Sequence, residues 1–122
     1  MILADTSVWI DHLNRGDARL RQLLDAGELI MHPFVVGEVA LGDFPDRLAT
    51  LVTMRDLPFA HVAEETEVLH LIEDLALSGT GIGYIGTHLL ASVLLTPETR
   101  LWTRDKSLRK VARQLSLDAG LA

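Results

Sequence analysis

The chain has 122 residues, enough for one domain around a single core but too few for two ordinary domains. It lacks cysteine, which excludes disulfides, zinc–thiolate sites and thiol catalysis, and no apolar run reaches the ~18 residues that a membrane span needs. The formal net charge of −6 at pH 7 argues against a protein that coats nucleic acid by charge alone.

The first half of the chain alternates short apolar runs with helical patterns. Residues 1–4 are predicted to form a strand that ends at Asp5, and helical spacing of apolar residues begins immediately afterwards. A second strand is predicted at 28–33, where Pro33 ends it, and a weaker third strand at 57–63. The helices predicted in this half cover 6–13, 17–27, 34–42 and 44–56.

The second half continues the alternation. A helix at 64–79 leads into a glycine-rich turn and a helix at 87–95, and a fourth strand at 100–103 precedes a final helix at 106–115. Short apolar strands separated by helices are typical of a parallel sheet that helices cover on both faces. We therefore expect a single α/β domain over 1–122, with three α/β/α layers and a short-stranded central parallel sheet.

The aromatic residues are expected to be mostly structural. Trp9 and Trp102 lie in apolar stretches and are predicted to be core residues rather than platforms for stacking bases. The five histidines do not form a ligand set. We expect His12 and His88, which lie near two of the motif blocks described below, to be surface or capping residues rather than contacts for nucleic-acid phosphates.

The charge is unevenly distributed along the chain. Residues 1–99 contain 15 acidic residues against 5 Lys or Arg, whereas residues 100–113 contain six bases and one acid. This basic strip would either guide a polyanion to one edge of the molecule or form a solvated helix face, and composition alone favours neither. Arg104 and Lys106, on either side of Asp105, are the candidates for an external contact.

Three acidic residues are expected at one edge of the predicted sheet. Asp5 directly follows the first strand, Asp105 lies just beyond the last, and Glu38 is on the helix after the second. Ligands of such sheets bind outside the carboxyl ends of the strands, and clustered carboxylates repel one another unless a cation such as Mg²⁺ or Mn²⁺ binds them. Taken singly, Asp5 and Asp105 are also explained as helix N-caps. Their equivalent positions favour a metal site.

Gly81, Gly83 and Gly86 have the G-x-G-x-x-G spacing of a dinucleotide-binding turn. That motif must follow a strand, but the preceding segment is predicted to be helical, and no suitable acidic residue follows ~20 residues later. We therefore do not expect dinucleotide binding.

Four blocks span nearly the whole chain, from residue 1 to about residue 113: "ILADTSVWIDHL", "VVGEVALG", "GIGYIGTHLLASVLL" and "RLWTRDKSL". In order and spacing they resemble the blocks of PIN-domain ribonucleases. The likeness is strongest to VapC-type toxins, the toxin subunits of VapBC toxin–antitoxin systems. No single block is specific, but the combination is.

The resemblance implies a metal-dependent endoribonuclease that hydrolyses RNA phosphodiester bonds with Mg²⁺ or Mn²⁺. Carried over by position, the metal-binding and catalytic acids are Asp5, Glu38 and Asp105. Ser7 and Thr103 match hydroxyl positions that support the metal or its water, and Thr103 is counted with the catalytic residues.

The family's third acidic position is occupied here by Gly86. A glycine is tolerated as an N-cap, so the fold should be unaffected, but the missing oxygen ligand implies weakened or lost catalysis. A non-catalytic PIN-fold binding protein is therefore an alternative. A signalling receiver domain is less favoured, because Asp5 is followed by Thr6 and Ser7 rather than by a second acid, and the expected phosphoacceptor Asp and Lys are missing.

The resemblance also implies partners. These are a structured RNA of the tRNA or rRNA type, a VapB-like antitoxin that inserts a basic side chain among the acids, and a second copy of the chain. Helices at 18–27 and 44–52 are candidates for the homodimer contact, and Arg104 and Lys106 for contact with RNA or antitoxin. Without an apparent leader or membrane segment, we expect a cytoplasmic protein.

Overall fold

The computed structural model describes residues 1–122 and has a three-stranded parallel sheet at its centre. The strands are β1 (Ile2–Ala4), β2 (Leu29–Ile30) and β3 (Arg100–Trp102), in the order β2-β1-β3. Both neighbours of β1 run parallel to it, so the carboxyl ends of the three strands lie at the same edge.

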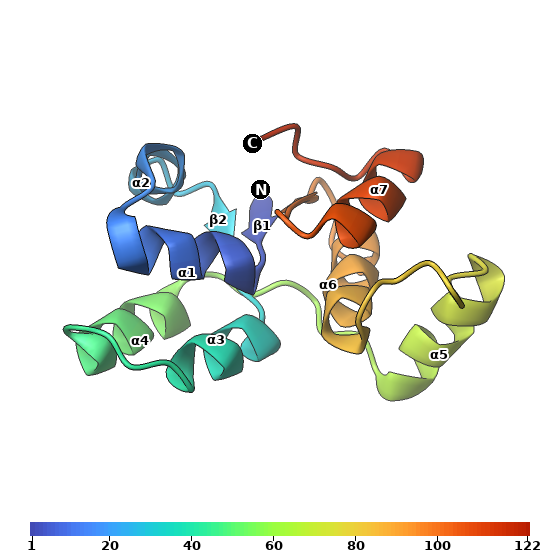
Figure 1. The fold of residues 1–122 in the computed structure, drawn as a ribbon, viewed down its shortest axis with the longest axis horizontal. Coiled ribbons are helices and arrows are strands. Elements are labelled where there is room, and N and C mark those ends of the chain that lie inside the picture. The colour runs from blue at the N-terminus through green and yellow to red at the C-terminus, as the bar shows by residue number, and fades with distance from the viewer.

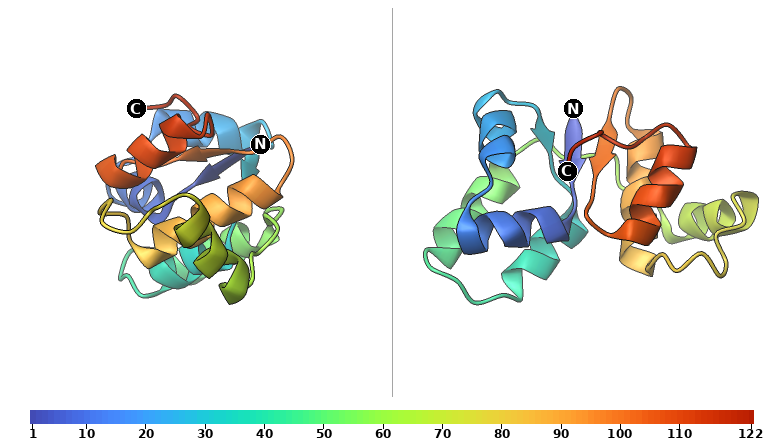
Figure 2. Two further views of the ribbon diagram at one scale, coloured as in Figure 1. Left: turned by 90° about the vertical axis from the view of Figure 1, so that its right-hand side faces the viewer. Right: turned by 45° about the horizontal axis from the view of Figure 1, so that its top comes forward.

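Seven helices flank the sheet: α1 (Thr6–Arg15), α2 (Ala18–Asp25), α3 (Pro33–Ala40), α4 (Arg47–Asp56), α5 (Glu65–Asp74), α6 (Tyr84–Leu95) and α7 (Lys106–Gln114). Figure 1 shows α1–α4 on one side of the strands and α5–α7 on the other, and the right-hand view in Figure 2 agrees. The predicted three-layer α/β/α fold is confirmed. None of the helices combines the length and apolar character needed to cross a membrane.

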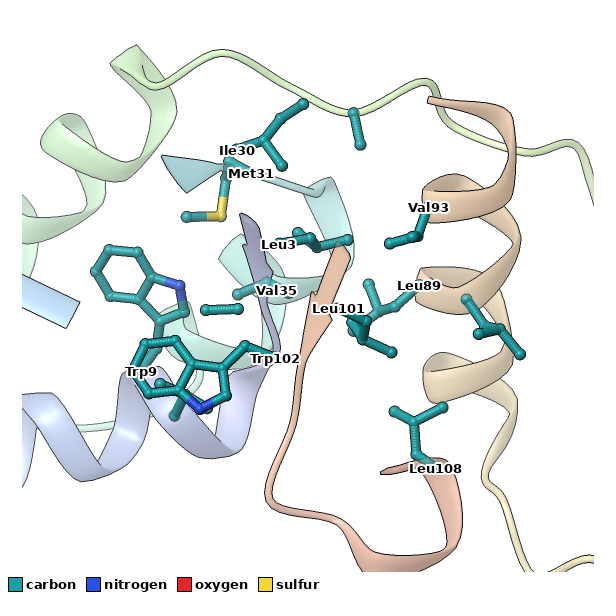
Figure 3. Packing of buried hydrophobic residues seen from close by; sticks show 14 of the residues in the cluster. Leu3, Trp9, Ile30, Met31, Val35, Leu89, Val93, Leu101, Trp102 and Leu108 are labelled. Carbon is teal, nitrogen blue, oxygen red and sulfur yellow. The ribbon is translucent and has the colours of Figure 1, made fainter. Parts of the chain in front are cut away.

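Most of each longer strand is buried between the helix layers, which accounts for the apolar sequences of β1 and of Leu101–Trp102 in β3, whereas Arg100 at the start of β3 is exposed. Leu3 of β1 and Leu101 of β3 are fully buried, with Leu89 on one side and Trp9 on the other (Figure 3). The prediction that both tryptophans are core residues is confirmed, because Trp9 is 3% and Trp102 1% exposed.

The strand predicted at 57–63 is wrong. Only a single parallel bridge forms there, between Met31 and Phe59. Met31 N donates to the carbonyl of Pro58 at 2.7 Å, and Ala60 N donates to the carbonyl of Met31 at 2.8 Å. Two prolines stop the ladder, since Pro58 has no N–H to donate and Pro33 starts α3 directly after Met31 and His32.

The C-terminal tail pairs with the opposite edge of the sheet, which the sequence did not predict. Leu101 N donates to the carbonyl of Leu117 at 2.7 Å, and Ala119 N donates to the carbonyl of Leu101 at 2.8 Å. The tail therefore covers part of an edge that β3 would otherwise leave unpaired.

The glycine-rich segment begins its helix earlier than predicted. The preceding helix ends at Asp74 rather than at 79, and Ala76 has a left-handed φ of 51°. Gly83 is the N-cap of α6 and Tyr84 its first residue. Gly86 is therefore the third residue of the helix, and its prediction as a residue at the N-cap is wrong.

Candidate functional site

Three acidic residues from separate elements line one cavity at the carboxyl edge of the sheet. Asp5 follows β1, Asp105 lies beyond β3, and Glu38 is on α3, the helix after β2. The cavity has a volume of about 350 Å³, and Gly86 on α6 also lines it. The structure thus brings together four positions that are far apart in the sequence.

Asp5 is almost completely buried and is held through both carboxylate oxygens. Its Oδ1 accepts hydrogen bonds from the backbone N of Ser7 at 2.9 Å and from the Ser7 hydroxyl, as the N-cap of α1. Its Oδ2 accepts from the buried Thr103 hydroxyl, whose oxygen in turn accepts from Asp105 N at 3.1 Å. Ser7 and Thr103 therefore fix the orientation of Asp5, and Thr103 also connects the loops that carry Asp5 and Asp105.

Glu38 and Asp105 are each held through one oxygen. Thr6 Oγ1 donates to Oε1 of Glu38 at 2.9 Å, and Leu108 N donates to Oδ1 of Asp105 at 3.0 Å as that residue caps α7. The second oxygen of each carboxylate has no donor within the chain. Protein contacts thus orient all three acids while leaving acceptor capacity for another ligand.

The donor set of the cavity consists of carboxylate and hydroxyl oxygens, which suit Mg²⁺ or Mn²⁺. No three acidic or histidine side chains lie close enough together to hold one ion as a ready-made cluster. Mg²⁺ usually keeps several waters and binds to only one or two carboxylates directly. A hydrated ion therefore fits these residues, whereas a closed three-carboxylate cage does not.

Gly86 lies close to α7. A Cβ atom at this position would lie 3.1 Å from Cδ2 of Leu108, so a side chain would require Leu108 to shift by a few tenths of an ångström. The first turn of α6 contains no acidic residue. A carboxylate at position 86 would therefore meet the positive end of the helix, with a tight apolar neighbour.

Arg104 is bound inside the chain. Its Nη1 lies 2.6 Å from Oδ2 of Asp11 and its Nη2 lies 2.5 Å from Oδ2 of Asp17. The guanidinium also lies 5.4 Å from the ring centre of Trp102, and its hydrogen bond lowers the pKa of Asp17. Contact of Arg104 with RNA or a partner would have to replace these ion pairs. Lys106 is exposed and forms no ion pair.

We expect Arg104→Met to lower the free energy of unfolding by about 1–3 kcal/mol, because the mostly buried Asp17 loses its charged partner. Arg15→Met is the matched control. Arg15 also pairs with Asp11, but at 3.6 Å and with a side chain that is 75% exposed. Arg15→Met should lower the free energy of unfolding by less than about 0.5 kcal/mol. Urea unfolding measures both, and equal losses would contradict the internal role of Arg104.

Thr6 and Tyr84 also line the cavity, although the sequence pattern predicted no role for either. Thr6 stands next to Asp5 in the first block, which is a signal for it, but its partner Glu38 lies 32 residues further on. Tyr84 lies in the third block between Gly83 and Gly86, and its place beside these glycines was the only signal for it.

A row of four aromatic rings leads from the core to the cavity. Ring centres are 5.1 Å apart for His32 and Phe34, 4.7 Å for Phe34 and His88, and 4.7 Å for His88 and Tyr84.

The prediction that His88 is a surface or capping residue is wrong, since it is 5% exposed and burial lowers its pKa. His12 does accept a hydrogen bond near a helix start, from Asp17 N at 3.0 Å.

Comparison with known proteins identifies the family. No protein-family model matches the chain. Ribonuclease VapC32 of Mycobacterium tuberculosis, from strains CDC 1551 / Oshkosh and H37Rv, is 46% identical over 109 residues, covering 89% of this chain and 88% of the relative. The chain belongs to the VapC ribonuclease family. It is a VapC-like endoribonuclease toxin on a PIN-like fold, and VapC ribonucleases are generally metal-dependent.

Proposed function

We propose that this VapC-type chain hydrolyses RNA with Mg²⁺ or Mn²⁺ bound among Asp5, Glu38 and Asp105, and that Gly86 limits its rate. The observation that supports this most directly is the shared cavity, in which Glu38 and Asp105 each keep an oxygen without a donor in the chain. A divalent ion would offset the repulsion among the three carboxylates.

When bound, the ion would neutralise charge at the phosphodiester and lower the pKa of a bound water. Other residues of the chain orient the carboxylates that would bind the ion. Ser7 and Thr103 hold Asp5, Thr6 holds Glu38, and the start of α7 holds Asp105. Position 86 supplies no side-chain oxygen, so we expect slower cleavage than four acids would give.

The proposed partners follow from the family and from exposed surfaces. Three acids and no base line the cavity, which suits a VapB-like antitoxin that inserts an Arg or Lys there. Exposed Leu41, Leu48 and Val52, at the end of α3 and on α4, support a homodimer contact. We propose a structured RNA of the tRNA or rRNA type as substrate, with Lys106 as a contact.

Cleavage of total tRNA and rRNA is expected to require Mg²⁺ or Mn²⁺ and to fall to background in EDTA. Glu38→Gln should reduce it on the order of tenfold, a modest loss because the starting rate is already low. Glu73, exposed on α5 and outside the cavity, provides the control, and Glu73→Gln should leave the cleavage rate unchanged.

Cleavage that persists in EDTA would refute the metal-dependent function. Absence of cleavage both in the chain as it stands and after an acid is introduced at position 86 would favour the alternative of a non-catalytic binding protein, for which Gly86 is the supporting observation.

A further inference from the structure

The charge of the cavity wall does not favour binding of a polyanion such as RNA. Its ten lining residues include three acids and no Lys, Arg or His: Asp5, Thr6, Glu38, Gly83, Tyr84, Ile85, Gly86, Leu89, Asp105 and Leu108. The chain as a whole carries a net charge of −6. Basic side chains that would bind phosphates, the usual source of affinity for RNA, are therefore absent from the cavity wall, and the exposed Lys106 lies beside it. Another kind of contact must supply part of the affinity.

Tyr84 and Ile85 form an apolar part of the cavity wall. Tyr84 is 48% and Ile85 39% exposed, and they are the first two residues of α6. Tyr84 is the single tyrosine of the chain, and both tryptophans are buried in the core. No Phe, Trp or His lines the cavity, so Tyr84 is the aromatic ring that it offers to a ligand.

The Tyr84 ring is supported from inside the protein. It packs perpendicular to the ring of His88, at an interplanar angle of 88° and a centre distance of 4.7 Å. His88 is itself buried and packs on Phe34. A ring braced in this way loses little conformational entropy when it stacks on a ligand.

We propose that Tyr84, together with Ile85, is a platform on which the cavity stacks one nucleobase of its RNA substrate. A base inside a duplex has both faces covered, so the nucleotide at the platform must be unpaired, as in a loop, bulge or single strand. This inference rests on the proposed nuclease function and narrows its substrate to RNA that presents an unpaired nucleotide beside the scissile phosphate.

The test measures binding rather than cleavage. A short fluorescein-labelled single-stranded RNA is titrated by fluorescence anisotropy, with Ca²⁺ in place of Mg²⁺ to fill the oxygen site and gels to verify that the RNA stays intact. Tyr84→Leu should weaken binding at least about fivefold, as expected for losing one stacked base, whereas Tyr84→Phe should bind as the unchanged chain does. Phe59→Leu is the matched control, since Phe59 is 40% exposed but outside the cavity.

A set of the same RNAs, each with one abasic nucleotide, identifies the stacked base. When the missing base is the one that stacks on Tyr84, the RNA should bind the unchanged chain and the Tyr84→Leu variant with equal affinity. Annealing the complementary strand should also abolish the difference in affinity between the two proteins. The proposal is refuted if Tyr84→Leu binds intact RNA normally, if its deficit persists with every abasic RNA and with duplex, or if the unchanged chain does not bind the RNA. Metal-dependent cleavage of tRNA and rRNA, assayed separately, shows whether the nuclease function fails as well.

Discussion

Gly86→Asp should raise metal-dependent RNA cleavage by a factor on the order of 10² or more, because it adds an oxygen to a cavity that already holds three acids. Position 86 is the third residue of α6 and lines the cavity with Asp5, Glu38 and Asp105. The amino end of the helix also favours a carboxylate there. The measurement is the initial rate of RNA cleavage with Mg²⁺, repeated in EDTA, together with Mn²⁺ affinity by electron paramagnetic resonance.

Gly86→Asn is the matched control for this substitution. It has nearly the same shape and meets the same Leu108 side chain 3.1 Å from its Cβ, but it carries no charge. It should therefore reproduce any packing effect without the gain in rate. Adding Asp5→Asn to the Gly86→Asp chain should return cleavage to the starting level. An equal rate for the Asp and Asn variants, or no gain for Asp, would mean that this position needs no carboxylate.

Acidification should destabilise the fold through His32, by about 3 kcal/mol in total and about 2 kcal/mol between pH 7 and pH 5. Burial, with a contribution from nearby His88, lowers the pKa of His32 from 6.5 to about 4. In the unfolded chain this histidine takes up its proton near pH 6.5, whereas in the fold it stays neutral until about pH 4. The stabilisation is therefore complete above pH 6.5 and is lost as the pH falls toward 4.

The hydrogen bonds of His32 also indicate that its protonation destabilises the fold. Its Nδ1 accepts a hydrogen bond from Phe34 N at 3.0 Å and so caps α3, while its buried Nε2 has no partner. Protonation would place a hydrogen on Nδ1 and remove this cap. His32→Asn keeps a capping acceptor but does not titrate. Urea unfolding at pH 7 and pH 5 should show a clearly smaller loss for the variant, and an identical loss would exclude His32 as the source.

The fold could be predicted where local sequence decided it. Strand β1 and the Leu101–Trp102 part of β3 are apolar and each precede a capping aspartate, and the pattern alone located both strands. The strand at 57–63 failed because one bridge next to Pro58 cannot extend. Pairing of residues 117–119 with Leu101 depends on which edge of the sheet is left open, and no local pattern encodes that.

The candidate site shows the same division. The rule that ligands bind at the carboxyl ends of parallel strands placed Asp5, Glu38 and Asp105 at one edge, and they line one cavity. The contacts that orient them could not be predicted, because Thr6 meets Glu38, and Thr103 meets Asp5, only after the chain has folded. For Arg104, the basic strip suggested an external contact, while its carboxylate partners lie 93 and 87 residues away.

The two aspartates at the cavity also hold the first turns of α1 and α7, and this affects how an active member of the family can be recognised. A related protein without nuclease activity would still need Asp5 and Asp105 as N-caps of α1 and α7. The requirement for folding would therefore be enough to preserve both aspartates. Their presence is therefore a poor marker of a working nuclease. Glu38 lies in the interior of α3, and position 86 is the third residue of α6 rather than its N-cap. Acidic residues at positions 38 and 86 therefore indicate an active nuclease in the VapC family better than Asp5 and Asp105 do.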